Sequence, residues 1–321
     1  MSVLIFIEHT EGLVKKASLE AITYGSQLAQ QLGVNAEGLV LGTPKEDLPA
    51  LGTYGLSRIY QVQNDILHQF DSQVYAKVIS SLAGEIGATV VIFSNNPAGK
   101  SLAPRVAVRL KAGLVSGATA LPDTTNGFTV RKNVFSGKAF ANVNVLSAIK
   151  VITLNVNSFT VKEVGGTAEI VQKDIAVDAP KVRVTDTTKT SSSVALTEAE
   201  TVVSAGRGLK GPENWKMVEE LAELLGAGLA CSRPVADAHW RPHNEHVGQT
   251  GVAIAPNLYI AIGISGAIQH LAGVNRSKVI VVVNKDPEAP FFKAADYGIV
   301  GDAFEVVPKM LEAVRKVKSS S

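Results

Sequence analysis

The glycine-rich segment GRGLKG, residues 206–211, constrains the possible folds of this chain more than any other feature. An apolar run, Thr201 to Ala205, precedes it, and an amphipathic run, Glu213 to Leu225, follows it. Glycines spaced in this way between a strand and a helix are typical of loops that bind a dinucleotide at the helix N-terminus. The segment therefore predicts an α/β domain with a nucleotide-cofactor site.

Four more loop motifs follow this segment, and most of them come directly after a strand-like apolar run. They are CSRP (Cys231 to Pro234), VGQTG (Val247 to Gly251), GISGAIQH (Gly263 to His270) and NKDPEAP (Asn284 to Pro290). An open parallel sheet binds its ligand with the loops at the ends of its strands. We therefore expect these loops to meet at a single site.

Composition and charge exclude several classes of protein. The net charge is +2 without a basic cluster, so the chain lacks the cationic stripe that binds nucleic acid. A single cysteine, Cys231, excludes an internal disulfide and any site built from several thiolates. The N-terminal run Val3 to Glu8 lacks the features of an export signal, and no apolar run reaches membrane-spanning length. We therefore expect a cytoplasmic protein that is not inserted in a membrane.

The first half of the chain alternates between strand and helix patterns, which predicts a parallel sheet covered by helices. The expected strands are Val3 to Ile7, Ala36 to Leu41, Ile59 to Val62 and Thr89 to Phe93, and the expected helices are Ala17 to Leu32, Asp71 to Ile86 and Ser101 to Leu110. From Phe128 to Val156 the apolar period changes to two, in FTVRKNVF, KAFANVNVL and VITLNV. These three runs predict antiparallel strands that form an added sheet.

A polar segment rich in serine and threonine, residues 185–193, is the best candidate for a linker between domains. The patterns on either side are self-contained, which favours a domain boundary over a surface loop. We therefore predict an N-terminal α/β domain over residues 1–188, which contributes to a subunit interface. A C-terminal doubly wound domain of Rossmann or flavodoxin-like type, residues 189–321, would bind the cofactor.

Three interpretations of the second half compete on the residues alone. A nicotinamide-binding domain needs an acidic residue after its second strand to bind the ribose, but Ser232 and Arg233 follow that strand here. An NADP-binding variant, with Arg233 at the extra phosphate, remains open. A hydrolase is suggested by Gly263, Ser265 and Ala267, yet the only later histidine is His270, one turn along the same helix.

A metal site is the third interpretation, because His239, His243 and His246 are spaced loosely like ligands. Pro242 argues against a helix that presents two of these histidines on one face, and no HExxH motif is present. No metal is therefore predicted.

The ordered set of motifs separates these interpretations. GRGLKG, CSRPVADA, VGQTG, LYIAIGISGAIQHLAG and VVVNKDPEAPFFKAADYGIVGD together resemble the C-terminal flavin domain of the electron transfer flavoprotein alpha subunit. The N-terminal half is similar to the first domain of that family in length and pattern. The resemblance spans essentially the whole chain.

The resemblance implies an electron carrier rather than an enzyme with its own small-molecule substrate. Members of the family bind one noncovalent FAD and form a heterodimer with a beta subunit, in which any AMP would be held. They carry electrons from dehydrogenases to a membrane quinone oxidoreductase or to the respiratory chain. A bifurcating member of the same family and an NADP-dependent reductase remain as alternatives.

The resemblance also assigns residues at the flavin ring. Arg233 matches the arginine that lies against the isoalloxazine, and Ser232 and Thr250 match positions that hydrogen-bond the ring or its neighbourhood. His270 matches the histidine near the pyrimidine carbonyl. Reduction places negative charge on this edge of the flavin, so a fixed cation and oriented donors raise the reduction potential.

The remaining cofactor-binding residues are expected along the rest of FAD. Ser265, Gly266 and Ala267 would turn their amides and a helix dipole toward the pyrophosphate, and Arg207 would add a cation. The resemblance places Asn284 and Asp302 at the adenosine end. Gln249, Gly251 and Gln269 complete the set as members of the same loops.

Two positions depart from the family pattern. His239 precedes Trp240 where relatives commonly carry glycine, and His246 precedes VGQTG where they commonly carry glutamine. These two extra imidazoles either tune the potential with pH or face solvent.

Overall fold

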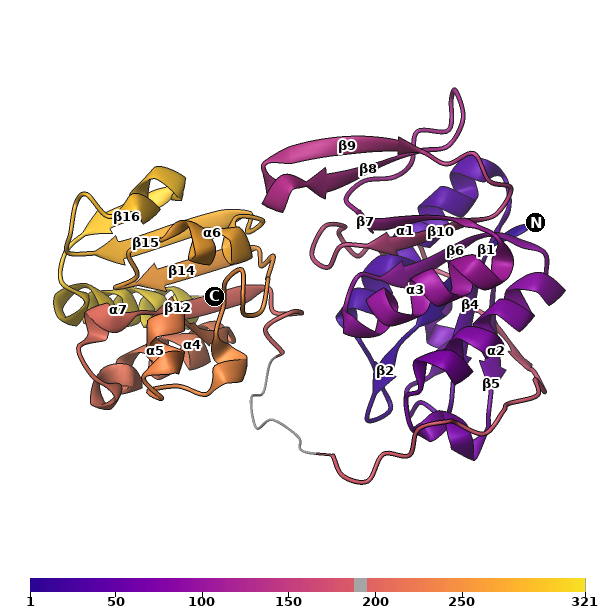
Figure 1. Cartoon of the computed structure of the whole chain (residues 1–321), viewed down its shortest axis with the longest axis horizontal. Helices are drawn as coiled ribbons and strands as arrows, with labels where there is room; N and C mark the ends of the chain where they lie inside the picture. The colour runs from indigo at the N-terminus through magenta and orange to yellow at the C-terminus, as the bar shows by residue number, and fades with distance from the viewer. Residues whose placement is uncertain (188–194, 321) are drawn as a thin grey trace. The chain divides into compact units, whose positions relative to one another are not determined.

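The computed structural model describes residues 1–187 and 195–320 (Figure 1). The chain divides into two compact units, Met1–Thr188 and Lys189–Ser321. Residues 188–193, most of the predicted linker, lie outside the described residues. Within the described part of the chain, no helix is both long and apolar enough to cross a membrane.

The first unit is built on one nine-stranded sheet, with the strand order β11-β5-β4-β1-β6-β10-β7-β8-β9. A short antiparallel pair, β2 and β3, lies apart from it. The strands are β1 (Ser2–Ile7), β2 (His9–Thr10), β3 (Leu13–Val14), β4 (Asn35–Leu41), β5 (Arg58–Val62), β6 (Ala88–Ser94), β7 (Gly113–Ala118), β8 (Thr129–Val134), β9 (Ala139–Asn144), β10 (Lys150–Leu154) and β11 (Glu169–Gln172).

Helices cover both faces of this sheet. The helices are α1 (Lys16–Leu32), α2 (Ser72–Glu85) and α3 (Pro97–Leu110), and the 3-10 turns are η1 (Leu48–Tyr54), η2 (Asp65–His68) and η3 (Phe135–Gly137). Val3 and Ile5 of β1 pack in the core beneath α1, whereas Leu4 and Phe6 pack in the core beneath α2 and α3. The unbroken apolar run of β1 is explained by this burial on both faces.

One expectation for the first unit was wrong. The hairpin of β8 and β9 is antiparallel, as predicted, but it extends the edge of the main sheet and does not form a second one. The run VITLNV became β10, which pairs in parallel with β6 and β7 inside the sheet. The alternating pattern of this run arose from Thr153, which is polar but buried. Its hydroxyl donates to Asn95 Oδ1 at 2.8 Å, so this polar residue does not face solvent.

The second unit is a five-stranded sheet in which every pairing is parallel, with the order β13-β12-β14-β15-β16. Its strands are β12 (Thr201–Ala205), β13 (Gly228–Cys231), β14 (Leu258–Ile262), β15 (Val279–Asn284) and β16 (Tyr297–Val300). Its helices are α4 (Lys216–Leu225), α5 (Arg233–Asp237), α6 (Ile268–Val274) and α7 (Ala303–Ser320), with 3-10 turns η4 (Arg207–Leu209), η5 (Pro212–Trp215), η6 (His243–Glu245) and η7 (Pro290–Ala294). This order is that of the flavodoxin-like doubly wound fold.

The direction of winding reverses at β12, which has β13 on one side and β14 on the other. Ligands of such folds bind in the crevice outside the carboxyl ends of the strands at this switch point. The helix expected from Glu213 begins at Lys216, because Pro212 to Trp215 form a 3-10 turn. The glycine motif therefore leads into the first helix through two short turns.

Candidate functional site

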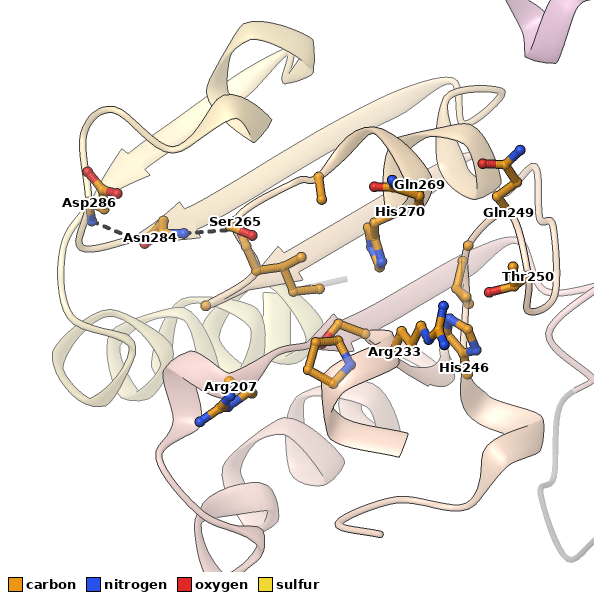
Figure 2. A pocket seen from close by; sticks show the side chains of 17 residues that line it. Arg207, Arg233, His246, Gln249, Thr250, Ser265, Gln269, His270, Asn284 and Asp286 are labelled. Carbon is orange, nitrogen blue, oxygen red and sulfur yellow. Dashed lines mark hydrogen bonds between the residues drawn. The ribbon is translucent and has the colours of Figure 1, made fainter. Parts of the chain in front are cut away.

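A cavity of about 560 Å³ lies at the carboxyl edge of the second sheet (Figure 2). Its walls come from the loops after β12, β13, β14 and β15 and from the loop that precedes β14. It is lined by Arg207, Ser232, Arg233, Pro234, His246, Val247, Gly248, Gln249, Thr250, Gly263, Ile264, Ser265, Ala267, Gln269, His270, Asn284 and Asp286. Loops from separate parts of the sequence thus converge at the switch point.

Most of the predicted cofactor-binding residues line this cavity. They are Arg207, Ser232, Arg233, Gln249, Thr250, Ser265, Ala267, Gln269, His270 and Asn284. Gly251, Gly266 and Asp302 are not among the lining residues. Asp302 instead accepts a hydrogen bond from the Phe304 amide at 3.0 Å at the start of α7. Its predicted contact with adenosine is therefore not supported by the lining of the cavity.

The two glycines outside the lining hold its loops in place. A Cβ on Gly266 would lie 2.4 Å from Phe291 Cβ, and a Cβ on Gly251 would lie 2.3 Å from the His246 carbonyl oxygen. Gly266 also has a φ of +80°, in the left-handed region that favours glycine. Both residues therefore permit close backbone packing behind the cavity wall.

Sequence reasoning missed several lining residues. Val247, Gly248, Gly263 and Ile264 lie within or beside the quoted motifs, and their places in those loops were the available signal. Asp286 was also missed, although it follows β15 by two residues in NKDPEAP. An acidic residue at a strand end is the group that binds a ribose in related nucleotide sites, so it could have been found.

The close approach of two loops shapes the floor of the site. Gly208 donates its amide to the Gly263 carbonyl at 3.1 Å, and a Cβ on Gly208 would lie 2.6 Å from Gly263 Cα. A Cβ on Gly206 would lie 2.4 Å from the Gly263 oxygen. Gly206 and Gly208 are thus required for packing against the loop after β14.

Further hydrogen bonds fix the loops of the wall. The backbone amide of Gln249 donates to the backbone carbonyl of Gln269 at 2.7 Å, which ties the VGQTG loop to α6. Asn284 Nδ2 donates to the Ile264 carbonyl at 3.0 Å, and Asn284 Oδ1 accepts from the Asp286 amide at 3.1 Å (Figure 2). This side chain adds to the backbone hydrogen bond from Gly263 to the Val283 carbonyl, 2.8 Å, which also joins the ends of β14 and β15.

Two arginines supply positive charge to the cavity. Arg207 lies in the turn after β12, and Arg233 is the first residue of α5. The Arg233 side chain is 65% exposed, and its Nε lies 3.2 Å from Asp237 Oδ2. An exposed ion pair of this kind contributes little to stability. It engages Nε of the guanidinium, and the N–H groups of the two terminal nitrogens are left to donate to a ligand.

His270 is a buried imidazole in the cavity wall. The Tyr259 hydroxyl and His270 Nε2 are hydrogen-bonded at 2.8 Å, so this nitrogen is engaged with a tyrosine and not with Ser265. Burial, with a smaller contribution from nearby His246, lowers the pKa of His270 to about 4. The ring is therefore neutral at neutral pH and can donate a hydrogen bond without carrying charge.

The burial of His270 predicts that stability falls in acid. In the unfolded chain the imidazole titrates near its ordinary pKa of 6.5, whereas the folded value is about 4. Between these values only the unfolded state binds the proton, so the free energy of unfolding decreases as the pH falls. The expected loss is roughly 3 kcal/mol, measurable by urea unfolding at several pH values. His270→Gln should remove most of the loss, and an unchanged profile in that variant would contradict this assignment.

Comparison with protein families agrees with this architecture. A family model described as the electron transfer flavoprotein FAD-binding domain matches residues 195–275. A second model, described as the electron transfer flavoprotein domain, matches residues 3–180. The first match covers β12 through α6 and most of the cavity-lining loops. FAD is therefore the cofactor of the second unit.

Whole-chain relatives agree with both matches. The chain is 36% identical over 322 residues to the electron transfer flavoprotein subunit alpha of Thermoanaerobacterium thermosaccharolyticum, with 98% of each chain covered. It is 35% identical over 316 residues to the protein of the same name from Syntrophomonas wolfei, with coverage of 97% and 98%. It is also 35% identical over 323 residues to the one from Bacillus subtilis, with 99% of each chain covered. The chain belongs to the electron transfer flavoprotein alpha-subunit family.

Proposed function

We propose that this chain is the FAD-carrying subunit of a heterodimer that moves electrons between protein partners. The observation that carries the proposal is the convergence of five loops on one cavity at the switch point of a parallel sheet. In this account one FAD is held noncovalently, and a beta subunit completes the protein. The donors are dehydrogenases, and the acceptor is a membrane quinone oxidoreductase or the respiratory chain.

The residues present fit a flavin nucleotide. The cavity volume lies within the range of sites for sizeable cofactors. Two buried imidazole nitrogens in its wall, Nδ1 of His246 and Nδ1 of His270, make no hydrogen bond within the described residues. Cations, amides and hydroxyls surround an apolar interior, as a charged and planar ligand requires.

At one end of the cavity, we propose that Arg233, Ser232, Thr250 and His270 hold the isoalloxazine ring. FAD, when bound, supplies the redox chemistry. The planar guanidinium of Arg233 provides a fixed positive charge beside the edge where negative charge develops, and Ser232 and Thr250 provide hydroxyl donors. Neutral His270 adds an oriented donor. The chain thus stabilises the reduced state by preorganised charge and hydrogen bonds.

Toward the other end, the loops after β14 and β15 would hold the pyrophosphate and the adenosine. Figure 2 places Asn284 and Asp286 far from Gln249 and Thr250 along the lining. Ser265 and Ala267 precede α6, and Arg207 contributes a cation for phosphate. Asp286 offers a carboxylate for ribose hydroxyls, the role for which Asn284 and Asp302 were predicted.

Two alternatives predict different behaviour. An NADP-dependent reductase would use Arg233 for the 2′-phosphate and would exchange hydride with NADPH. A bifurcating member of the family would hold a second flavin in the partner subunit, where the simple carrier holds at most AMP. The absence of an acidic residue after β13 weakens a nicotinamide site but leaves the NADP variant to experiment.

An electron-transfer assay tests the proposal. The copurified heterodimer is mixed anaerobically with a flavin dehydrogenase and the substrate of that dehydrogenase, and in a parallel assay with NADPH. A carrier is expected to lose its flavin absorbance with the reduced dehydrogenase and to remain oxidised with NADPH. Rapid bleaching by NADPH alone would contradict the carrier function.

A further inference from the structure

His246 is a buried imidazole in the cavity wall. The residue is only 3% exposed, and its Nδ1 has no hydrogen-bond partner within the described residues. A Cβ on Gly251 would lie 2.8 Å from this nitrogen, so the backbone of the VGQTG loop closes over the ring. Figure 2 shows the ring beside Arg233, at the end of the cavity that carries Thr250. The imidazole is thus held at the proposed flavin end.

A second imidazole connects His246 with solvent. His243 is exposed in η6, and the centroids of the two rings are 5.7 Å apart with the planes tilted by 55°. We take this exposed neighbour as the route by which a proton reaches the buried ring.

The groups around His246 leave its ring uncharged in the resting protein. Burial is the largest cause that lowers its pKa, and electrostatic interactions with His243 and Arg233 act in the same direction, whereas Asp237 opposes them. On η6, the Glu245 carboxylate is neutralised by Arg241, at 2.7 Å and 2.8 Å.

The remaining titratable neighbours of His246 are neutral at neutral pH. On β13, burial raises the pKa of the Cys231 thiol to about 12, so this group stays protonated. On α6, His270 is neutral. New negative charge at the end of the cavity near Thr250 would therefore meet the fixed cation of Arg233 and two buried imidazoles, His246 and His270, of which His246 has the exposed neighbour His243.

We propose that His246 takes up one proton when the cofactor in this cavity is reduced. The inference rests on the proposed function. One electron enters the cavity from the donor protein, one proton passes from solvent past His243, and the proton binds the imidazole nitrogen that carries none. The charge of the cavity is unchanged by the combined step. Arg233 provides a constant charge at this end, whereas His246 provides a charge that follows the redox state.

This coupling makes the first reduction potential of bound FAD depend on pH. Where reduction and protonation occur together, the slope approaches about 59 mV per pH unit, the one-electron equivalent of a tenfold change in proton concentration. His246→Gln replaces the imidazole with an amide that does not titrate. We expect the variant to keep FAD and to lose most of the slope in the pH range where only the reduced state of the wild type binds the proton at His246.

The matched control is His239→Asn. His239 is exposed, does not line the cavity, and has a φ of +56°, which asparagine tolerates well. This variant removes an imidazole from the same region and should keep the wild-type slope. Equal slopes in the wild type, His246→Gln and His239→Asn would overturn the inference.

A second measurement does not depend on activity. Proton NMR of the loaded wild-type heterodimer follows the imidazole C–H resonances through a pH titration in the oxidised and the fully reduced states. One histidine should bind its proton at least tenfold more tightly in the reduced state than in the oxidised state. The C–H resonance of that histidine should be absent from the spectrum of His246→Gln. Unchanged titration of every histidine would contradict the coupling, whereas a heterodimer without FAD would instead overturn the proposed function.

Discussion

Gly206→Ala is expected to weaken FAD binding substantially. The new methyl group would lie 2.4 Å from the Gly263 carbonyl oxygen, which is backbone and accepts the Gly208 amide. Relief of this overlap displaces the loop after β14, and with it Ser265 and the start of α6. Overpacking of this kind costs about 1 to 3 kcal/mol. If the bound state bears this cost, FAD affinity falls roughly 5- to 150-fold. Flavin release during dilution and dialysis measures the loss.

Gly84→Ala is the matched control for this steric effect. Gly84 lies in α2 of the other unit, and a Cβ there meets nothing within 4 Å. Alanine in a helix is favoured over glycine by up to about 1 kcal/mol, so this variant should be slightly more stable and should bind FAD normally. If Gly206→Ala matched it in both FAD affinity and thermal stability, the close approach of the two loops would not be what shapes the site.

Arg233→Ala is expected to lower the first reduction potential of bound FAD more than it lowers FAD affinity. The guanidinium is proposed to stabilise a negative charge that exists only after reduction, so its removal affects mainly the reduced state. The loss of one charge-assisted contact corresponds to about 1 to 3 kcal/mol, or roughly 40 to 130 mV for one electron. Anaerobic redox titration measures it.

Arg233→Lys separates the charge from the shape of this side chain. Lysine restores the positive charge without the planar fork, so about half of the lost potential should return. Asp237→Asn is a further control, because it removes the ion-pair partner of Arg233 and leaves the guanidinium in place. Parental potentials in both Arg233 variants, with FAD retained, would show that Arg233 has only a structural role.

Much of the C-terminal unit could be predicted because its signals are local. A buried parallel strand is a continuous apolar run, and the loop that follows it carries the ligand, so Ser232, Thr250, Ser265 and Asn284 could be placed by their positions after or between strands. The structure brought these loops together as expected. The flavodoxin-like strand order itself depends on long-range pairing and came from the structure.

The expectations that failed depended on contacts distant in sequence. The run around Thr153 looked half-exposed, because no local pattern reveals that Asn95 and Ser116 would satisfy its hydroxyl inside the sheet. The burial of His246 was likewise undetermined, since it depends on how Gly251 folds back over the ring.

The most direct test of the account is the cofactor content of the chain when it is coexpressed with its beta subunit. The purified complex is analysed by its absorption spectrum, by cofactor release in acid and by mass. We expect a yellow one-to-one heterodimer with one releasable FAD per alpha chain, and easier release of that FAD from Gly206→Ala. A folded, colourless chain that binds NADP in the same cavity would contradict it.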